Sequence, residues 1–279
     1  MNPVPYTPKL PGRNDNLSPE SPMKELGILL GGLLGGILAL YIGLGLLVDF
    51  LVPRMSMETE RRIAGFFSQL ADTAEKTTSR AKYLQALADG LRARCAALPY
   101  DIRVVVTENE TVNAVALPGG TVVVFSGLLE KMSSENELAF VLSHELGHFQ
   151  HRDHLRAMGR GLAFMALTAL VFGSDSTAGE FLARSIGITE MGFSRIQETR
   201  ADEFALSAVN CFYGHMGGAT VFFEKIREAE DPELFGQYFT SHPEVAERIR
   251  HLTEFGSAKA FSSGPLKALP GEVTSRDKR

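Results

Sequence analysis

A five-residue segment in the middle of the chain, His144-Glu145-Leu146-Gly147-His148, has the residue types and the spacing of a catalytic metal site. On a helix, residues four apart lie on one face, so both imidazoles can reach the same ion. Glu145 lies one step round the helix, where it can hold a metal-bound water but cannot itself be a ligand. Two imidazoles and an adjacent glutamate are typical of zinc hydrolases, in which the glutamate is the general base. We therefore expect one Zn²⁺ per chain.

A third protein ligand is required, and two residues compete for the role. His154 stands at the spacing of a longer zinc motif, but the glycine that would turn the chain back is replaced by His151. Both histidines are instead expected at the exposed end of the helix, where positive charge is favourable. Glu198 is the other candidate, and Asp202, one turn later, can accept the N–H of a zinc-bound histidine. The spacing alone leaves an ordinary solvated acidic face open as well.

The two ligand segments are expected on separate helices. Ser134 and Glu137 form a capping pair ahead of a helix that should continue to about Arg152, and this helix carries the paired histidines. Apolar periodicity predicts further helices at three places: around 194–209, around 217–230, and from His242 to about Phe255.

Three runs rich in β-branched residues predict a small sheet. The runs cover 102–106, 112–117 and 121–125, and the Pro118-Gly119-Gly120 turn between the last two indicates a hairpin. The last run is expected to pair, main chain to main chain, with an extended substrate. The residues predicted to bind substrate are Asn113, Thr121, Val122, Val123 and Val124.

Residues 26–48 contain no charged side chain. A helix of this length reaches roughly 34 Å, enough for a hydrocarbon core of ~30 Å. No small-residue cleavage site follows it, so we expect an uncleaved single-pass anchor in contact with membrane lipid. Basic residues flank both sides equally and do not assign the orientation. Gly27, Gly31 and Gly35 form a stripe that would suit self-association of the anchor, with the alternative that glycine is simply frequent in membrane helices.

Composition excludes some classes of function. The formal net charge of -5 and the pI of about 5.8 lack the basic footprint of a protein that binds nucleic acid. Cys95 and Cys211 have neither the number nor the spacing of a disulfide framework. We interpret them as two unrelated buried thiols, with a single bridge as the alternative in an oxidising compartment.

The chain is expected to have five parts. Residues 161–172, which lie inside the fourth part, are apolar but too few to span a membrane. This segment should be a buried helix or should dip into the membrane. The parts are a disordered arm (1–24), a transmembrane anchor (25–52), a helical neck (53–98), the candidate catalytic domain (99–256) and a flexible tail (257–279).

Four stretches, in order, resemble the HtpX-like and CAAX-prenyl-protease-like metallopeptidases, which are gluzincins with an HExxH motif. Together they cover roughly residues 90–255. They are Asn113-Ala114-x-Ala116-x-Pro118-Gly119-Gly120, the segment from His144 to His148, Ser194-Arg195-x-x-Glu198-x-x-Ala201-Asp202-x-x-Ala205, and His242-Pro243 with Arg248-Ile249.

This resemblance implies an α+β, mostly helical domain of the minigluzincin type and zinc-dependent endoproteolysis of misfolded or membrane proteins. It implies that Glu198 is the third ligand and that His242 hydrogen-bonds the oxyanion, beside the base Glu145. Because many relatives have several membrane spans and this chain has one, it is most similar to single-anchor quality-control members, which favours a catalytic domain outside the cytoplasm.

Two alternatives remain open. The first is a membrane-tethered zinc-binding chaperone without turnover, although the intact Glu145 argues against it. The second is a self-inhibited protease, in which His242 fills the remaining position on the metal. His215 and His251 match no motif and are interpreted as structural or surface residues.

Overall fold

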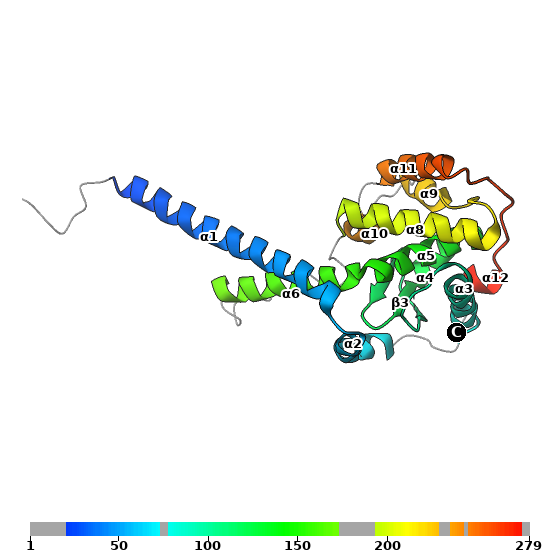
Figure 1. Cartoon of the computed structure of the whole chain (residues 1–279), viewed down its shortest axis with the longest axis horizontal. Helices are drawn as coiled ribbons and strands as arrows, with labels where there is room; N and C mark the ends of the chain where they lie inside the picture. The colour runs from blue at the N-terminus through cyan, green and yellow to red at the C-terminus, as the bar shows by residue number, and fades with distance from the viewer. Residues whose placement is uncertain (1–20, 73–77, 173–192, 229–234, 243–244, 275–279) are drawn as a thin grey trace, which may run out of the picture. The chain divides into compact units, whose positions relative to one another are not determined.

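The computed structural model describes residues 21–72, 78–172, 193–228, 235–242 and 245–274, and it divides into two units, 1–43 and 44–279. The predicted disordered arm therefore lies almost wholly outside the described residues. The architecture of the described residues is mainly helical with one small sheet, which confirms the predicted α+β class (Figure 1).

The first unit contains most of one long helix, α1 (Pro22–Leu51), which a short 3-10 turn, η1 (Val52–Arg54), continues in the second unit. Its leucines are exposed within the first unit, Leu29 by 70% and Leu33 by 60%. Among the described residues, this is the one helix that is long and apolar enough to cross a membrane. Length and composition thus agree with the predicted single span.

The sheet in the second unit has three strands in the order β1-β3-β2, with β1 parallel and β2 antiparallel to β3. The strands are β1 (Arg103–Thr107), β2 (Ala114–Leu117) and β3 (Thr121–Phe125). Gly119 and Gly120 have φ angles of 83° and 89°, which residues other than glycine rarely adopt, so the predicted hairpin turn is explained by its sequence.

This strand order corrects one prediction. We expected Thr121, Val122, Val123 and Val124 to pair with substrate, but β3 is the central strand and both of its edges are already hydrogen-bonded. Within the described residues, β1 and β2 are the two edge strands. Helix α3 (Ser79–Cys95) packs beside β1, where Gln85 accepts the N–H of Val104, so the outer edge of β2 is the better candidate for pairing with an extended peptide. The local pattern of β-branched residues marks a strand but does not reveal its place in the sheet.

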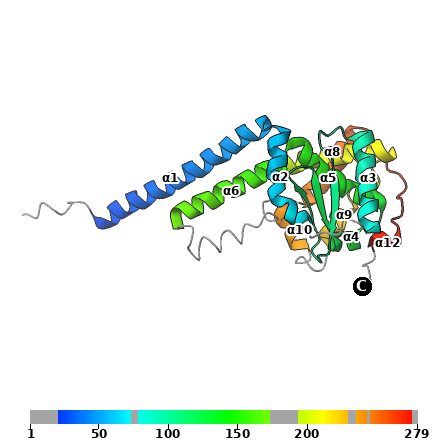
Figure 2. The same ribbon diagram turned by 90° about the horizontal axis from the view of Figure 1, so that it is seen from below.

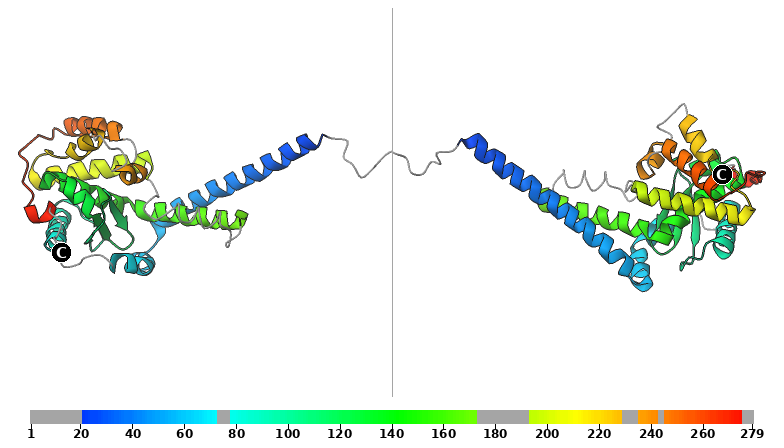
Figure 3. Two further views of the ribbon diagram at one scale, coloured as in Figure 1. Left: turned by 180° about the vertical axis from the view of Figure 1, so that it is seen from behind. Right: turned by 45° about the horizontal axis from the view of Figure 1, so that its top comes forward.

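Helices pack in layers against the sheet, and α5 and α8 form the central layer (Figures 1 and 3). Helix α3 packs beside β1, and α2 lies at the other flank of the sheet (Figure 2). The helices named so far are α2 (Met57–Asp72), α3 (Ser79–Cys95), α5 (Glu135–His151) and α8 (Arg195–Tyr213). The others in the second unit are α4 (Ser126–Lys131), α6 (Asp153–Phe172), α9 (Val221–Glu228), α10 (Gly236–Ser241), α11 (Val245–Ala258) and α12 (Gly271–Thr274).

A buried carboxylate, Glu60 of α2, ties the segment after the anchor to the domain. It accepts hydrogen bonds from Tyr100 (2.9 Å) and from the backbone N–H of Gly119 in the hairpin turn (3.2 Å), and it lies 2.9 Å from His154 Nε2. His154 is therefore not a metal ligand. Our expectation that it lies at an exposed helix end was wrong, because only 4% of it is exposed. The helix does end at His151, but Arg152 takes a left-handed conformation and α6 begins at once, which buries the next turn.

The C-terminal segment also differs from the expected flexible tail. The backbone N–H of Glu135, at the start of α5, donates to the carbonyl of Lys267. Lys267 N–H in turn donates to the side chain of Asn136, and Val273 of α12 is fully buried in the main core. The segment is polar because its side chains face water, while its backbone caps the first turn of the metal-site helix.

Cys95 and Cys211 are joined in a disulfide that links the end of α3 to the end of α8. Our interpretation of two unrelated thiols was wrong, because residues 116 apart in sequence meet when these helices pack, and no local pattern encodes that meeting. The bond closes a loop that contains the whole sheet and α5.

Replacing both cysteines, Cys95→Ala with Cys211→Ala, is expected to lower the free energy of unfolding by about 2–5 kcal/mol, since the open chain gains conformational entropy when it unfolds. Denaturant unfolding monitored by circular dichroism measures this difference. The control is the wild-type protein under reducing conditions, which should lose the same stability, whereas equal midpoints for variant and oxidised wild type would contradict the prediction.

Candidate metal centre

Helix α5 carries the paired histidines in the interior of the domain. Ser134 accepts a hydrogen bond from the N–H of Glu137 and fixes the start of the helix, as the sequence predicts. Every residue from Glu135 to Phe149 is buried. A helix buried on all sides is normally apolar, so its ionisable residues His144, Glu145 and His148 need partners that offset the cost of burial.

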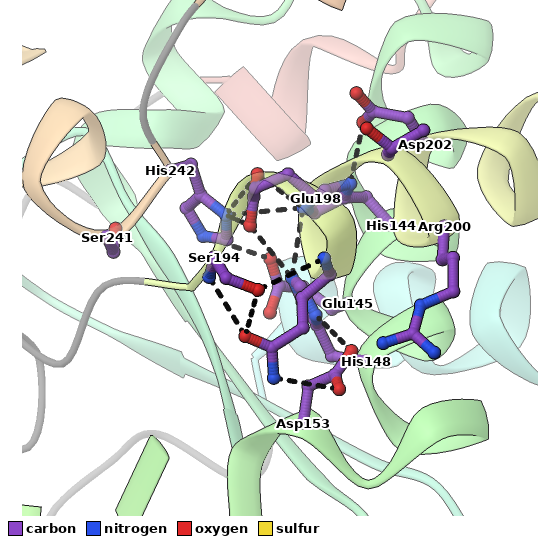
Figure 4. A network of polar contacts seen from close by, with 12 residues as sticks. His144, Glu145, His148, Asp153, Ser194, Glu198, Arg200, Asp202, Ser241 and His242 are labelled. Atoms are coloured by element: carbon purple, nitrogen blue, oxygen red, sulfur yellow. Dashed lines mark hydrogen bonds and ion pairs between the residues drawn. The ribbon is translucent and has the colours of Figure 1, made fainter. Parts of the chain in front are cut away.

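Four side chains from three segments converge on one point (Figure 4). His144, His148, Glu198 and His242 each offer one atom to a group in which all atoms lie within 4.8 Å of one another. The Nε2 atoms of His144 and His148 are 3.1 Å apart, and each is 3.5 Å from an oxygen of Glu198. The structure thus brings the predicted ligands of α5 and α8 together.

A close contact between α5 and α8 makes this convergence possible. A Cβ atom added at Gly147 would lie 2.9 Å from the Cα of Ala201 and 3.1 Å from its carbonyl oxygen. Those distances leave no room for a side chain on α5 at this point. The glycine between the two histidines therefore lets the helix that carries Glu198 approach.

Each histidine of α5 has a carboxylate behind it. His144 Nδ1 lies 2.9 Å from Asp202, and His148 Nδ1 lies 3.4 Å from Asp153. Such partners hold the Nδ1 proton and leave the Nε2 lone pair free for a metal. Gln197 donates a hydrogen bond of 2.9 Å to Asp153 and holds this second carboxylate in place.

Arg248 of α11 neutralises the carboxylates. Its guanidinium donates two hydrogen bonds to Asp202, of 2.7 and 2.8 Å, and lies 2.7 Å from Glu198. Burial raises the pKa of both carboxyls, but nearby positive charge lowers it by more. At Asp202 the opposing groups are Arg248 and His144. At Glu198 they are His242, Arg248 and the paired imidazoles of α5. The pKa values of Glu198 and Asp202 therefore lie below their usual range, and both groups are anionic.

The donor set fits a divalent cation. With Nδ1–H directed at the carboxylates, the Nε2 lone pairs of His144 and His148 face each other and the Glu198 anion, an arrangement that is repulsive unless a positive charge lies between them. Burial lowers the pKa of His148, but Asp153 and Glu198 more than compensate and raise it to about 9, whereas burial dominates at His144 and lowers its pKa to about 4. Two imidazoles and one carboxylate are ligands that zinc prefers in catalytic sites.

Glu145 lies beside this group without a fixed partner. Neither of its carboxylate oxygens makes a hydrogen bond of good geometry within the described part of the chain, and the nearest imidazole nitrogen, His242 Nε2, is 3.8 Å away. Burial raises the pKa of Glu145 and outweighs the opposite effects of His242, His148 and the backbone of Ala116. A buried acceptor without a donor requires a water or a substrate, as a general base does.

His242 is held by two aromatic rings and by Glu198. Its Nδ1 lies 3.0 Å from one oxygen of Glu198, and its ring stacks on Tyr238 with 4.8 Å between centroids. Phe193 stacks on His148 in the same way, at 3.8 Å. These rings fix the orientation of both imidazoles and keep water from one side of the group.

A narrow groove runs from this group along β2. It has a volume of about 30 Å³, room for a small side chain, and it is bordered by Leu117, Met158, Phe193 and His242. Asn113, predicted to bind substrate, is buried at the start of β2, where its Oδ1 accepts the N–H of Ala114.

Sequence reasoning missed three residues of the site: Asp153, Gln197 and Arg248. Asp153 lies five residues after His148, beyond the end of the helix, where helical spacing no longer applies. Arg248 is quoted above only as part of a matching motif, with no role attached. The buried Glu198 and Asp202 require a buried positive charge, and composition alone does not reveal which residue provides it.

A buried helix with two facing imidazoles and an unpartnered glutamate, completed by a glutamate from a second helix, defines the HExxH class of zinc metallopeptidases. Comparison with known proteins specifies the family. The model of Peptidase family M48 matches residues 78–255. The chain is 26% identical to "Metalloprotease LoiP" of Escherichia coli, over 67% of this chain and 75% of that protein.

Two further relatives agree. The chain is 28% identical to "Metalloprotease YcaL" of Escherichia coli, over 65% of this chain and 72% of that protein. It is 32% identical to "Mitochondrial metalloendopeptidase OMA1" of Arabidopsis thaliana, over 54% of this chain and 31% of that protein. The chain belongs to peptidase family M48 and is a metalloendopeptidase, which confirms the resemblance to HtpX-like zinc enzymes.

Replacement of Asp202 by Asn is expected to weaken zinc binding about 10–100-fold, because the amide no longer accepts the His144 N–H as an anion. Titration of the metal-free protein against a competing chelator measures the affinity. Glu203→Gln is the matched control, since it removes the same charge one residue away, where Glu203 pairs with His251. Equal zinc affinities for the two variants would contradict the proposed role of Asp202.

Proposed function

We propose that the protein is a membrane-anchored endopeptidase with one Zn²⁺, bound by His144, His148 and Glu198, and that it cleaves unfolded stretches of membrane or envelope proteins. The observation that carries this proposal is the carboxylate of Glu145, which has no hydrogen-bond partner of good geometry and lies 3.8 Å from His242, a residue that borders the groove along β2. The exposed apolar helix α1 supports the anchoring.

The residues have separate roles in hydrolysis. When bound, zinc would acidify a water and polarise the peptide carbonyl. Glu145 takes the proton of that water and passes it to the leaving amine, and its raised pKa suits a group that must hold the proton in between. His242 donates to the oxyanion from the opposite side.

Strand β2 binds the substrate main chain. The N–H of Phe125 donates to the carbonyl of Asn113, so these two residues form a hydrogen-bonded pair of the β2–β3 ladder. In an antiparallel ladder such pairs alternate along the strand. Ala114 and Ala116 therefore direct their backbone groups away from β3. Because the N–H of Ala114 already donates to Asn113 Oδ1, the carbonyl of Ala114 and the backbone groups of Ala116 are the ones proposed to pair with an added strand.

The substrate must be locally unfolded. A strand of four residues provides few main-chain hydrogen bonds, and they form only with a peptide that is itself extended. The short strand therefore favours substrates with an unstructured backbone and reads little of their sequence, as a quality-control protease requires.

The catalytic domain is proposed to lie on the oxidising side of the membrane. The Cys95–Cys211 bond supports this orientation, because disulfides persist in such compartments and are rare in the cytosol. Self-association through the glycine stripe of the anchor stays a prediction, and so does the absence of a nucleic-acid partner.

The variant Glu145→Gln is expected to lose about 10²–10⁴-fold in cleavage rate while it keeps its zinc, since the amide cannot accept the proton. Cleavage of casein and of a misfolded membrane protein, together with zinc content per chain, measures both properties. Glu203→Gln serves as the control and should cleave at the wild-type rate. Zinc at one per chain without cleavage by the wild type would instead favour the tethered chaperone.

A second candidate function is a self-inhibited protease, because His242 offers a nitrogen to the same group as the three expected ligands. The two roles of His242 predict opposite signs. If it supports the oxyanion, His242→Ala should lower kcat about 10²–10³-fold. The kinetic assay should include His251→Ala as a control, and a rate above that of the wild type would identify His242 as an inhibitory ligand.

A further inference from the structure

Helix α6 consists of two chemically different halves. The first, Asp153–Arg160, contains charged residues and borders the groove through His154, Ala157 and Met158. The second, 161–172, contains no charged residue, and its one hydroxyl, that of Thr168, donates to a carbonyl of the same helix. A helix segment without a charged residue on any face is either buried in protein or surrounded by lipid.

One face of the second half is buried, as at Leu167 and Thr168, but another face is not. Leu162 is 53% exposed and Leu170 is 73% exposed, and Ala166 between them is exposed as well. These three residues are four apart and form one stripe along the helix. Figures 1 and 2 show α6 protruding from the body of the second unit.

The first half of α6 is fastened to the last turns of α1. Asp49 accepts two hydrogen bonds of 2.9 Å from Arg160. Val48 packs so closely that a Cβ at Gly159 would lie 2.7 Å from it. Further along, Arg152 donates to the carbonyl of Val52 at 3.1 Å.

These contacts fix the direction of α6. Residue numbers fall from Val52 in η1 to Val48 in α1, while those of their partners rise from Arg152, just before α6, to Arg160 in α6. The two segments therefore run antiparallel where they touch. Beyond Arg160, α6 continues toward the side from which the last turns of α1 arrive.

We propose that residues 161–172 insert into the same bilayer that α1 crosses and that the stripe of Leu162, Ala166 and Leu170 contacts acyl chains. The inference rests on the proposed membrane anchoring of α1. Twelve residues extend roughly 18 Å, too short for a hydrocarbon core of ~30 Å, so the segment enters one leaflet obliquely and does not span it. The Asp49–Arg160 pair lies where the charged residues of both helices end, at the level of the headgroups.

The test uses the absence of tryptophan from the natural sequence. A single tryptophan is introduced into the full-length chain as Leu162→Trp or Leu170→Trp, and each variant is reconstituted into phosphatidylcholine vesicles with or without bromine-labelled acyl chains. Leu266→Trp is the matched control, because Leu266 is 51% exposed and lies in the C-terminal segment of the domain. Leu33→Trp reports on the anchor itself.

The expected result is that the bromolipid quenches the Leu162→Trp and Leu170→Trp variants as strongly as Leu33→Trp and that their emission moves to shorter wavelengths, while Leu266→Trp is unaffected. Quenching of the Leu33→Trp variant alone would overturn the inference and leave the anchor in place. Quenching of none of the variants would overturn both. Casein cleavage by the same preparations separates these outcomes from a failure of the peptidase assignment.

Discussion

The metal site depends on one steric constraint, the close approach of α5 and α8 at Gly147 and Ala201. Two helices that carry ordinary side chains at a contact lie about 8–10 Å apart. A carboxylate from one would then reach an imidazole of the other only with difficulty. Because Gly147 has no Cβ, Glu198 comes within 3.5 Å of both histidines. Gly147 thus has a structural role, although the HExxH motif allows any residue at its position.

The same approach buries an unusual amount of charge. Glu198, Asp202, Asp153 and Arg248 all lie in the interior, where an ion without a partner would be strongly destabilising. Arg248 offsets part of this cost, with its guanidinium 4.3 Å above the ring of Phe223. The remaining negative charge favours a bound cation or protonated imidazoles, so filling of the site is expected to stabilise the fold. Function and stability are thus linked in one cluster.

Local features of this molecule were predictable from sequence, because they depend on neighbours along the chain. Helical spacing placed His144 and His148 on one face, and the glycines at 119 and 120 marked the hairpin. The position of β3 in the centre of the sheet was not predictable, because strand order depends on which segments meet in three dimensions. Burial of His154 against Glu60 and the pairing of Cys95 with Cys211 depend on such meetings too, and no short pattern records them.

Helix α6 has a mechanical consequence for the choice of scissile bond. Met158, at the groove, and Leu162, at the start of the lipid-facing stripe, are one helical turn apart, about 6 Å. Because a helix joins them, the proposed insertion of residues 161–172 would hold the catalytic glutamate at a fixed height above the headgroups, so that it could not follow a substrate into solution. Such an enzyme selects its targets by reach. Under that proposal it would cut a loop or stalled segment where the segment leaves the bilayer, and it would spare the same sequence when a folded domain holds it farther away.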